Sequence, residues 1–244
     1  KDNPEIEVKI GVLDNVNSFP ELVGVLDIYF LEYQPNSLWK KSFTPKFHEL
    51  VQSFKPNIIH SNRFLAEFIT TEKIYPNTTY VCHGRDNMIQ LENWQWSNLI
   101  NKGNLINWLE KQILIKQKYK KTNTQFIANS EDTYAYFQKV LLKKDRKNVK
   151  IIYNAVDLSK FAVAEEKTLA PERPLQLINV GSFQKKKNQI FLIEIAKYLR
   201  DKNIAFEFNL IGDGAEKENV ANAIKANGLE NQVFLRGIQN NVED

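Results

Sequence analysis

The sequence predicts an α/β fold with parallel strands, divided between two domains. Three observations carry this prediction. Short runs rich in Ile, Val, Phe and Tyr alternate with longer amphipathic segments, which is the pattern of βα units. Most of these short runs end in glycine or a polar residue. A polar, acidic stretch with prolines at its C-terminal end, residues 162–173, divides the alternation into two parts.

The short apolar runs are the expected strands, because β-branched and aromatic residues are enriched in them. They are Val8–Leu13, Leu26–Tyr29, Asn57–His60, Thr79–Cys82, Gln125–Ala128, Lys150–Tyr153, Leu175–Val180, Phe206–Ile211 and Val233–Leu235. The expected helices lie between them, where apolar residues recur at roughly helical spacing. They are Pro45–Phe54, Leu105–Lys121, Asp132–Leu142, Gln189–Lys202 and Lys217–Asn227.

We therefore expect an N-terminal domain over residues 1–161, a linker over 162–173, and the first half of a C-terminal domain over 174–244. The second part has only three strands and two helices, half of a doubly wound sheet. The first part opens on a strand with no βα unit before it. Both domains are therefore expected to be truncated.

Composition excludes several classes of protein. No apolar run approaches the roughly 18 residues of a membrane span, and the N-terminus has no signal-like apolar core. A single cysteine, Cys82, allows no internal disulfide and fits a reducing compartment. We predict a cytoplasmic protein.

The net charge of +4 is unevenly distributed, since residues 100–150 hold 12 Lys and Arg against 4 Asp and Glu. Such a patch attracts anionic lipid or nucleic acid, but a solvated helical face has the same composition. Residues 93–121 combine tryptophans, aliphatics and a basic end, which is typical of an interfacial amphipathic element. Nothing in the sequence supplies the stacking or groove-reading pattern of a nucleic-acid-binding protein, so peripheral contact with the inner membrane surface is the expectation.

Ligands of open parallel sheets bind outside the carboxyl ends of the strands. The residues at these ends in the first part are predicted to line a polar cleft. They are His60, His83, Arg85, Asn129, Ser130, Asn154 and Asp157. Cys82 and His83 are neighbours on a strand and point to opposite faces, so they cannot chelate one metal ion, and we expect no metal site.

The stretch LINVGSFQKKKN, residues 177–188, suggests an anion site in the second part. Gly181 allows a tight turn off the strand, and a helix is expected to begin near Asn188. The N–H groups of a helix N-terminus suit a phosphate, and Lys187 lies just before them. A solvated basic loop is the alternative. Gly212-Asp213-Gly214 form a second such turn, which departs from the G-x-G-x-x-G fingerprint at Lys217.

Several stretches resemble group 1 glycosyltransferases in order and spacing: VKIIYNAVDLSKF, LQLINVGSFQKKKNQIFLIEIAKYL, FEFNLIGDGAEKENV and NQVFLRG. KPNIIHSN, TYVCHGRDN and TQFIANSED resemble the acceptor-side domain of the same family. These are the retaining enzymes of glycosyltransferase family four. The resemblance covers nearly the whole chain and is most specific over residues 150–237.

The resemblance implies the GT-B fold, with two Rossmann-like domains facing across a cleft. It implies transfer of a sugar from a nucleotide-diphosphate sugar to a glycan or lipid-linked acceptor, with retention and without a metal or other cofactor. Assembly of cell-surface polysaccharide or lipopolysaccharide is the usual setting. The resemblance puts donor phosphates at Gly181, Ser182, Lys187 and the Gly212–Gly214 turn. It puts the family's catalytic cleft histidine at His83.

The chain departs from the family's Gly-Arg-x-x-x-x-Lys phosphate motif, because Ser182 replaces the arginine. The lost charge-assisted hydrogen bond is worth about 1.5–3 kcal/mol where it forms. Either Lys185 or Lys186 compensates, or donor binding is weaker. This departure favours the alternative of a non-catalytic nucleotide- or sugar-binding module with the same architecture.

Two elements of the family are missing from the sequence. Its glycine-rich first loop would precede residue 1, and its pair of donor-contacting glutamates would follow residue 244. We therefore expect an internal fragment of a longer enzyme, inactive as a glycosyltransferase by itself.

Overall fold

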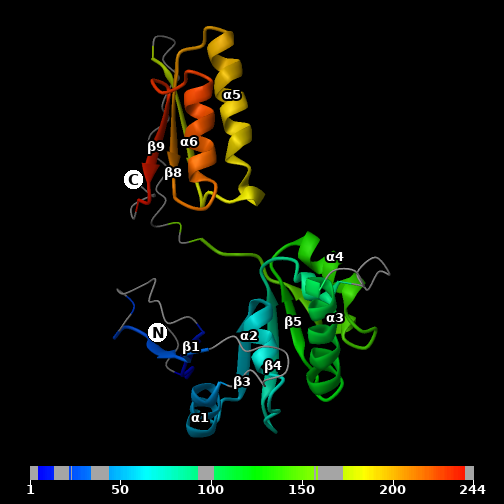
Figure 1. Ribbon diagram of the computed structural model, residues 1–244. Helices are drawn as coiled ribbons and strands as arrows, with labels where there is room; N and C mark the ends of the chain where they lie inside the picture. The colour runs from blue at the N-terminus through cyan, green and yellow to red at the C-terminus, as the bar shows by residue number, and fades with distance from the viewer. Residues whose placement is uncertain are drawn as a thin grey trace. The chain divides into compact units, whose positions relative to one another are not determined.

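The computed structural model describes residues 5–13, 22, 24–33, 44–92, 102–156, 158 and 173–239. The chain divides into two compact α/β units, Lys1–Ala155 and Val156–Asp244, shown in Figure 1. All but the last residue of the predicted linker lies outside the described residues, so the predicted domain boundaries stay a prediction.

The first unit alternates strands and helices as the sequence predicts. Its strands are β1 (Lys9–Val12), β2 (Asp27–Phe30), β3 (Ile58–Asn62), β4 (Thr79–Gly84), β5 (Gln125–Ala128) and β6 (Val149–Ile151). Its helices are α1 (Pro45–Phe54), α2 (Arg63–Ile69), α3 (Lys102–Leu114) and α4 (Glu131–Val140), with 3-10 turns η2 (Ile89–Leu91) and η5 (Arg146–Asn148). A π-helical turn, η4 (Ile115–Tyr119), extends α3.

All strand pairs of the first unit are parallel. Strands β3–β4–β5–β6 form one sheet in that order, and β1–β2 form a second. A cavity of about 130 Å³ lies between β1, α1 and β3, and His60 and Ser61 stand among its mainly apolar lining residues. The larger apolar core lies around β4 and β5, where Phe126 and Phe137 are fully buried.

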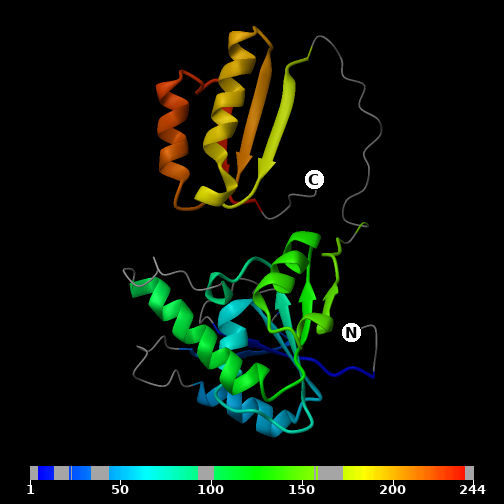
Figure 2. The same cartoon turned by 90° about the vertical axis from the view of Figure 1, so that its right-hand side faces the viewer.

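The second unit has one parallel sheet in the order β7 (Leu175–Val180), β8 (Phe206–Ile211) and β9 (Val233–Gly237). Helices α5 (Gln189–Asp201) and α6 (Lys217–Ala226) cover the same face of this sheet, as Figure 2 shows. Three side chains of β8 are buried on the covered face: Phe206, Phe208 and Leu210. A 3-10 turn, η6 (Lys185–Lys187), precedes α5.

Every predicted strand and helix has a counterpart, usually within three residues at each end. Helix α2 was not predicted. The predicted helix Leu105–Lys121 is an α-helix followed by the π-turn η4. None of the helices in the described part of the chain is long and apolar enough to cross a membrane.

Candidate functional site

The loops after β7 and β8 are bound to each other at the carboxyl edge of the second sheet. The Gly181 N–H donates to the Ile211 carbonyl at 2.9 Å, and the Phe183 N–H donates to the Asp213 carbonyl at 2.9 Å. Phe183 is fully buried and anchors its loop in the core. The two glycine turns singled out from the sequence therefore form one rigid edge.

At two of these positions, neighbouring backbone atoms lie too close to allow any residue other than glycine. Gly212 has a φ of +137° and Gly214 a φ of +153°, both in the region that glycine adopts most readily. A Cβ at Gly214 would lie 2.9 Å from the Phe183 nitrogen, and one at Gly212 would lie 2.9 Å from the Gly181 carbonyl carbon. Gly181 itself has open space around its Cβ position.

Asp213 lies in the same edge, but its carboxylate is already engaged. Its Oδ1 accepts from the Gly214 N–H at 2.7 Å, and its Oδ2 lies 2.6 Å from Lys217 Nζ. The hydrogen bonds from Lys217 and Gly214 lower the pKa of Asp213. A fixed carboxylate repels phosphate, so the contribution of this residue to the edge is the fixed turn geometry.

The lysine run forms the exposed turn η6 beside this edge. Asn188 follows with a left-handed φ of 52° and gives the first turn of α5 no side-chain cap. The Gln189 side chain is buried and donates to the Ser182 carbonyl at 3.1 Å, which fixes the loop to the helix. Lys187 is exposed and has no ion pair among the described residues. The uncapped helix start and a free cation thus stand next to each other.

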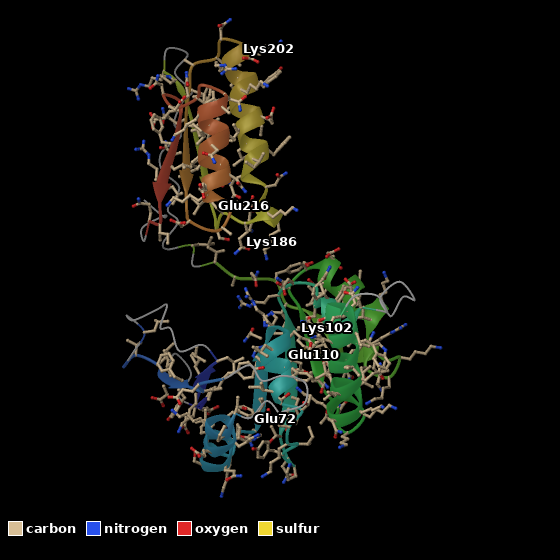
Figure 3. All side chains as sticks on the ribbon, in the orientation of Figure 1. Glu72, Lys102, Glu110, Lys186, Lys202 and Glu216 are labelled. Carbon is tan, nitrogen blue, oxygen red and sulfur yellow. The ribbon has the colours of Figure 1, made fainter. Side chains whose placement is uncertain are left out.

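Figure 3 locates this edge within the second unit. Lys186 and Glu216, near the starts of α5 and α6, lie at the same end of the unit, and Lys202 lies at the opposite end. The strands of the sheet are parallel, so their carboxyl ends meet at one edge. The predicted phosphate-binding residues, including Ser182, therefore gather at one end of this unit.

In the first unit, β3 and β4 bring two predicted residues into contact. His60 Nε2 lies 3.3 Å from His83 Nδ1, and the imidazole rings stack with centroids 5.3 Å apart and planes at 16°. The strand register pairs Asn62 with His83, so His60 is the diagonal neighbour of His83. This contact could not be predicted from the sequence, because it depends on the register of the two strands.

Burial and nearby positive charge act on both imidazoles. Burial and then the Arg85 guanidinium lower the pKa of His60. Burial, His60 and Arg85 lower the pKa of His83. Both rings are therefore held in the neutral form at pH 7. His83 Nε2 is enclosed and has no hydrogen-bond partner among the described residues.

Of the remaining cleft residues predicted for the first unit, Arg85 follows the end of β4, and Asn129 and Ser130 follow the end of β5. Asn129 donates to the Arg85 carbonyl at 3.2 Å, and its Oδ1 accepts from Thr133 at 3.0 Å. Ser130 caps α4 by accepting from the Thr133 N–H at 3.1 Å. These bonds fix the loop that carries Arg85.

Asn154 and Asp157 were predicted for the same edge, beyond the end of β6. Asn154 is exposed, and Asp157 lies outside the described residues. The neighbouring Tyr153 donates to Glu131 Oε1 at 3.0 Å, and this bond raises the Tyr153 pKa. The loop after β6 is thus tied to the start of α4.

Beneath His60, a polar network that sequence reasoning missed lies in the interior. Lys118 Nζ lies 2.7 Å from Glu67 Oε1 and donates to Thr70 Oγ1 at 2.5 Å. The Ser61 hydroxyl donates to Glu67 Oε2, which links the network to β3 next to His60. The sequence signal was weak, since isolated Glu and Lys residues on amphipathic segments are normally exposed.

His48, on helix α1, lies 2.7 Å from the Tyr75 hydroxyl and 3.1 Å from Glu72, with a side chain only 14% exposed. The basic segment 100–150 was counted as surface charge, but Lys111 and Lys118 are buried in it. Cys82 is fully buried.

Among the described residues, no three His, Cys, Asp or Glu side chains gather as a metal ion would require. The gathered groups are instead two histidines and an arginine in the first unit, and lysines with a helix start in the second. This chemistry suits anionic and hydroxyl-bearing ligands.

Two family descriptions match the chain in succession. Residues 6–160 match Glycosyltransferase Family 4, and residues 160–244 match Glycosyl transferases group 1. An uncharacterised glycosyltransferase of Methanocaldococcus jannaschii is 24% identical over 248 residues, covering 91% of this chain and 57% of that protein. WcaL of Escherichia coli, named for colanic acid biosynthesis, is 27% identical over 94 residues, covering 38% of this chain and 23% of that protein.

Solved structures share the fold at low sequence identity. HepE of Anabaena, solved with UDP and glucose, has a TM-score of 0.68 at 18% identity, covering 96% of this chain and 62% of HepE. WaaG, a glycosyltransferase involved in lipopolysaccharide biosynthesis, has a TM-score of 0.60 at 12% identity, covering 89% of this chain and 59% of WaaG. The chain thus spans about 60% of the length of these relatives, and its predicted α/β fold class, GT-B, is confirmed.

Proposed function

Because the chain belongs to the group 1 glycosyltransferases of Glycosyltransferase Family 4, we propose that it forms part of a retaining enzyme. The enzyme moves a sugar from a nucleotide-diphosphate sugar to a glycan or lipid-linked acceptor. WcaL and WaaG, similar in sequence or fold, are named for colanic acid and lipopolysaccharide biosynthesis. Their names support a role in assembling cell-surface polysaccharide or lipopolysaccharide.

The observation that carries the proposal is the carboxyl edge of the second unit. The glycine turns after β7 and β8 let backbone approach closely, and Lys187 stands without a counter-ion before the uncapped start of α5. A nucleoside diphosphate supplies the negative charge that this edge lacks. The UDP bound in the HepE structure supports the same ligand class here.

Charge on the leaving group gives these residues their chemical role. Negative charge builds on the diphosphate as the bond from its oxygen to the anomeric carbon breaks. Lys187 and the N–H groups of α5 stabilise that charge in place. The acceptor hydroxyl attacks from the face that the diphosphate leaves and gives its proton to a phosphate oxygen, so the anomeric configuration is retained. We propose that this transfer requires no metal ion or other cofactor.

In the first unit, we assign His83 to the sugar side of the reaction. Its lowered pKa keeps the imidazole neutral at pH 7, so it acts through hydrogen bonding. His60 engages its Nδ1 and fixes the orientation of the ring.

The alternative function is a non-catalytic nucleotide- or sugar-binding module. One observation favours it: Ser182 stands where the family motif has an arginine, and its exposed side chain carries no charge for a diphosphate. The expectation that these 244 residues alone give no turnover also stays a prediction. The enzyme and a nucleotide-binding module both predict nucleotide binding, a module that binds only sugar does not, and only the enzyme predicts sugar transfer.

We further propose a cytoplasmic enzyme that contacts the inner membrane surface through residues 100–150. With Lys111 and Lys118 buried, the contact rests on the exposed lysines, among them Lys102, Lys116 and Lys120. Anionic lipid attracts each by about 1 kcal/mol. Flotation with vesicles containing anionic lipid, compared with neutral vesicles, tests this contact. Equal binding to both vesicle types would exclude it.

A thermal-unfolding screen tests the function. UDP, GDP and ADP are added separately, and the nucleotide that binds is expected to raise the melting temperature by an amount that grows with the logarithm of its concentration over its Kd. The matching nucleotide sugars are then assayed for release of nucleoside diphosphate with glycan acceptors. Binding with sugar transfer supports the enzyme and contradicts the expected inactivity of the 244 residues alone. Binding without transfer is expected both from an inactive part of the enzyme and from a nucleotide-binding module, and transfer by a longer protein that contains these residues separates the two. No stabilisation by any nucleotide would contradict both and would leave only a sugar-binding module.

A further inference from the structure

The first unit brings two basic imidazoles and the Arg85 guanidinium together at the ends of β3 and β4, and the carboxylate of the following residue, Asp86, forms no ion pair with Arg85 among the described residues. Arg85 is exposed, and its guanidinium has no hydrogen bond or ion pair among the described residues. His60 and His83 stand beside it, and no carboxylate acts on either imidazole. An unpaired guanidinium beside two basic rings is an arrangement that an anion stabilises.

Hydrogen bonds from neighbouring residues hold Arg85 and His60 in place. Asn129 fixes the Arg85 carbonyl, and Asn129 is itself held by Thr133 at the start of α4. The contact between His60 Nε2 and His83 Nδ1 orients the His60 ring and leaves its Nδ1 uncommitted. Arg85 and His60 are therefore presented on fixed supports at one edge of the sheet.

We propose that His60, His83 and Arg85 form a binding site for a phosphate group. The Arg85 guanidinium donates to two phosphate oxygens, and His60 donates from Nδ1. For His60 to donate from both nitrogens, the histidine pair takes up one proton, which it shares across the His60–His83 contact. The bound phosphate supplies the negative charge that keeps that proton in place.

As a substrate site, the cluster rests on the proposed glycosyl transfer, whereas phosphate binding itself does not. The phosphate has two sources in such a reaction, because a lipid-linked or phosphorylated acceptor carries one and so does the nucleotide donor. Both sources present the same phosphate group to the cluster, and the experiment below distinguishes them. The cluster lies wholly within the first unit, whereas Lys187 belongs to the second.

Histidine NMR tests the proposal directly, because the chain has only three histidines. Protein with ¹⁵N-labelled histidine is titrated with inorganic phosphate at pH 6.5 and constant ionic strength. His48 serves as an internal reference, since it is bonded to Tyr75 and Glu72 away from the cluster. We expect saturable shifts of the His60 and His83 signals and no shift of His48.

Three variants define the site. Arg85→Gln and His60→Gln each weaken phosphate binding about tenfold or more, the loss of one charge-assisted hydrogen bond of about 1.4 kcal/mol. Lys139→Gln is the matched control, because it removes one exposed positive charge from the last turn of α4 in the same unit and leaves binding within twofold. Equal weakening by Arg85→Gln and Lys139→Gln, or a common shift of all three histidines, would overturn the site.

UDP then distinguishes the two sources. If UDP shifts His60 and His83 in the Lys187→Ala variant as well, the phosphate at the cluster is the donor's. If phosphate shifts these signals and UDP does not, it belongs to the acceptor. If the chain binds phosphate at the cluster but binds no nucleotide, the phosphate site is supported and the proposed function is contradicted.

Discussion

Lys118 and Glu67 form an ion pair in the interior of the first unit, with Nζ and Oε1 2.7 Å apart and both side chains at most 1% exposed. Removing one partner of such a pair leaves an uncompensated buried charge. Lys118→Met is therefore expected to lower the free energy of unfolding by about 3–5 kcal/mol. Urea denaturation monitored by fluorescence measures this loss.

The double variant Lys118→Met/Glu67→Met is the control. It removes both charges together, so at least half of the lost stability is expected to return. Equal stability of the single and double variants would contradict the pairing.

Gly214 is expected to tolerate no side chain. At a φ of +153°, with Phe183 backbone atoms 2.9 Å from the Cβ position, Gly214→Ala adds both conformational strain and steric overlap. We expect a loss of about 2–4 kcal/mol from these two effects. Gly181→Ala, where nothing lies within 4 Å, is the matched variant and should change stability by less than about 1 kcal/mol. Denaturation midpoints compare the two, and equal losses would refute the account of this edge.

The histidine pair makes stability depend on pH. Burial and Arg85 lower the pKa of His60 and His83 from 6.5, so the unfolded chain binds more protons as the pH falls. Stability is therefore full above about pH 6.5 and declines below it, toward the lowered pKa values of the folded state. His60→Gln/His83→Gln should show a shallower decline between pH 7.5 and 5.5 in denaturation series. Parallel curves for both proteins would contradict the shifts.

Cys82 should be chemically inert in the folded chain. It is fully buried, and burial raises the pKa of its thiol, so little thiolate is present or reachable. Labelling with a thiol-specific reagent should occur only when the first unit opens, and Lys118→Met should accelerate it. Rapid labelling of the unaltered chain under native conditions would show that the core around β4 is open.

The elements with strong local patterns could be predicted from the sequence. Helix α1 and strands β5, β7 and β8 have their predicted bounds, because apolar periodicity and flanking turns define them. Helix α2 was missed because it has only seven residues and starts directly after β3 at Arg63, which has a left-handed φ of 67°. Its N-cap, Asn62, is a favoured capping residue, although its side chain makes no capping hydrogen bond. The π-turn η4 was also missed, since one extra residue per turn leaves little trace in the pattern of a helix.

The sheet edge at which the candidate site lies could be predicted from the sequence, but the contacts between its side chains could not. Residues at the carboxyl ends of parallel strands gather whatever the register, so the positions of His83 and Gly181 followed from the pattern alone. The His60–His83 contact and the Glu67–Lys118 pair depend on register and packing over long sequence separations. Lys118 was counted among the surface charges of residues 100–150. Its burial could not be foreseen, because it depends on an ion pair with Glu67, 51 residues earlier in the chain.

The central claim is that the turn after β7 holds the diphosphate of a nucleotide donor through Lys187. Calorimetric titration of UDP and GDP into the chain and its Lys187→Ala variant tests it most directly, with Lys186→Ala as the matched control. The account predicts saturable binding of one nucleotide, weakened about tenfold or more by Lys187→Ala and nearly unchanged by Lys186→Ala. Equal affinity of all three proteins for the nucleotide, or no binding to any of them, would contradict it.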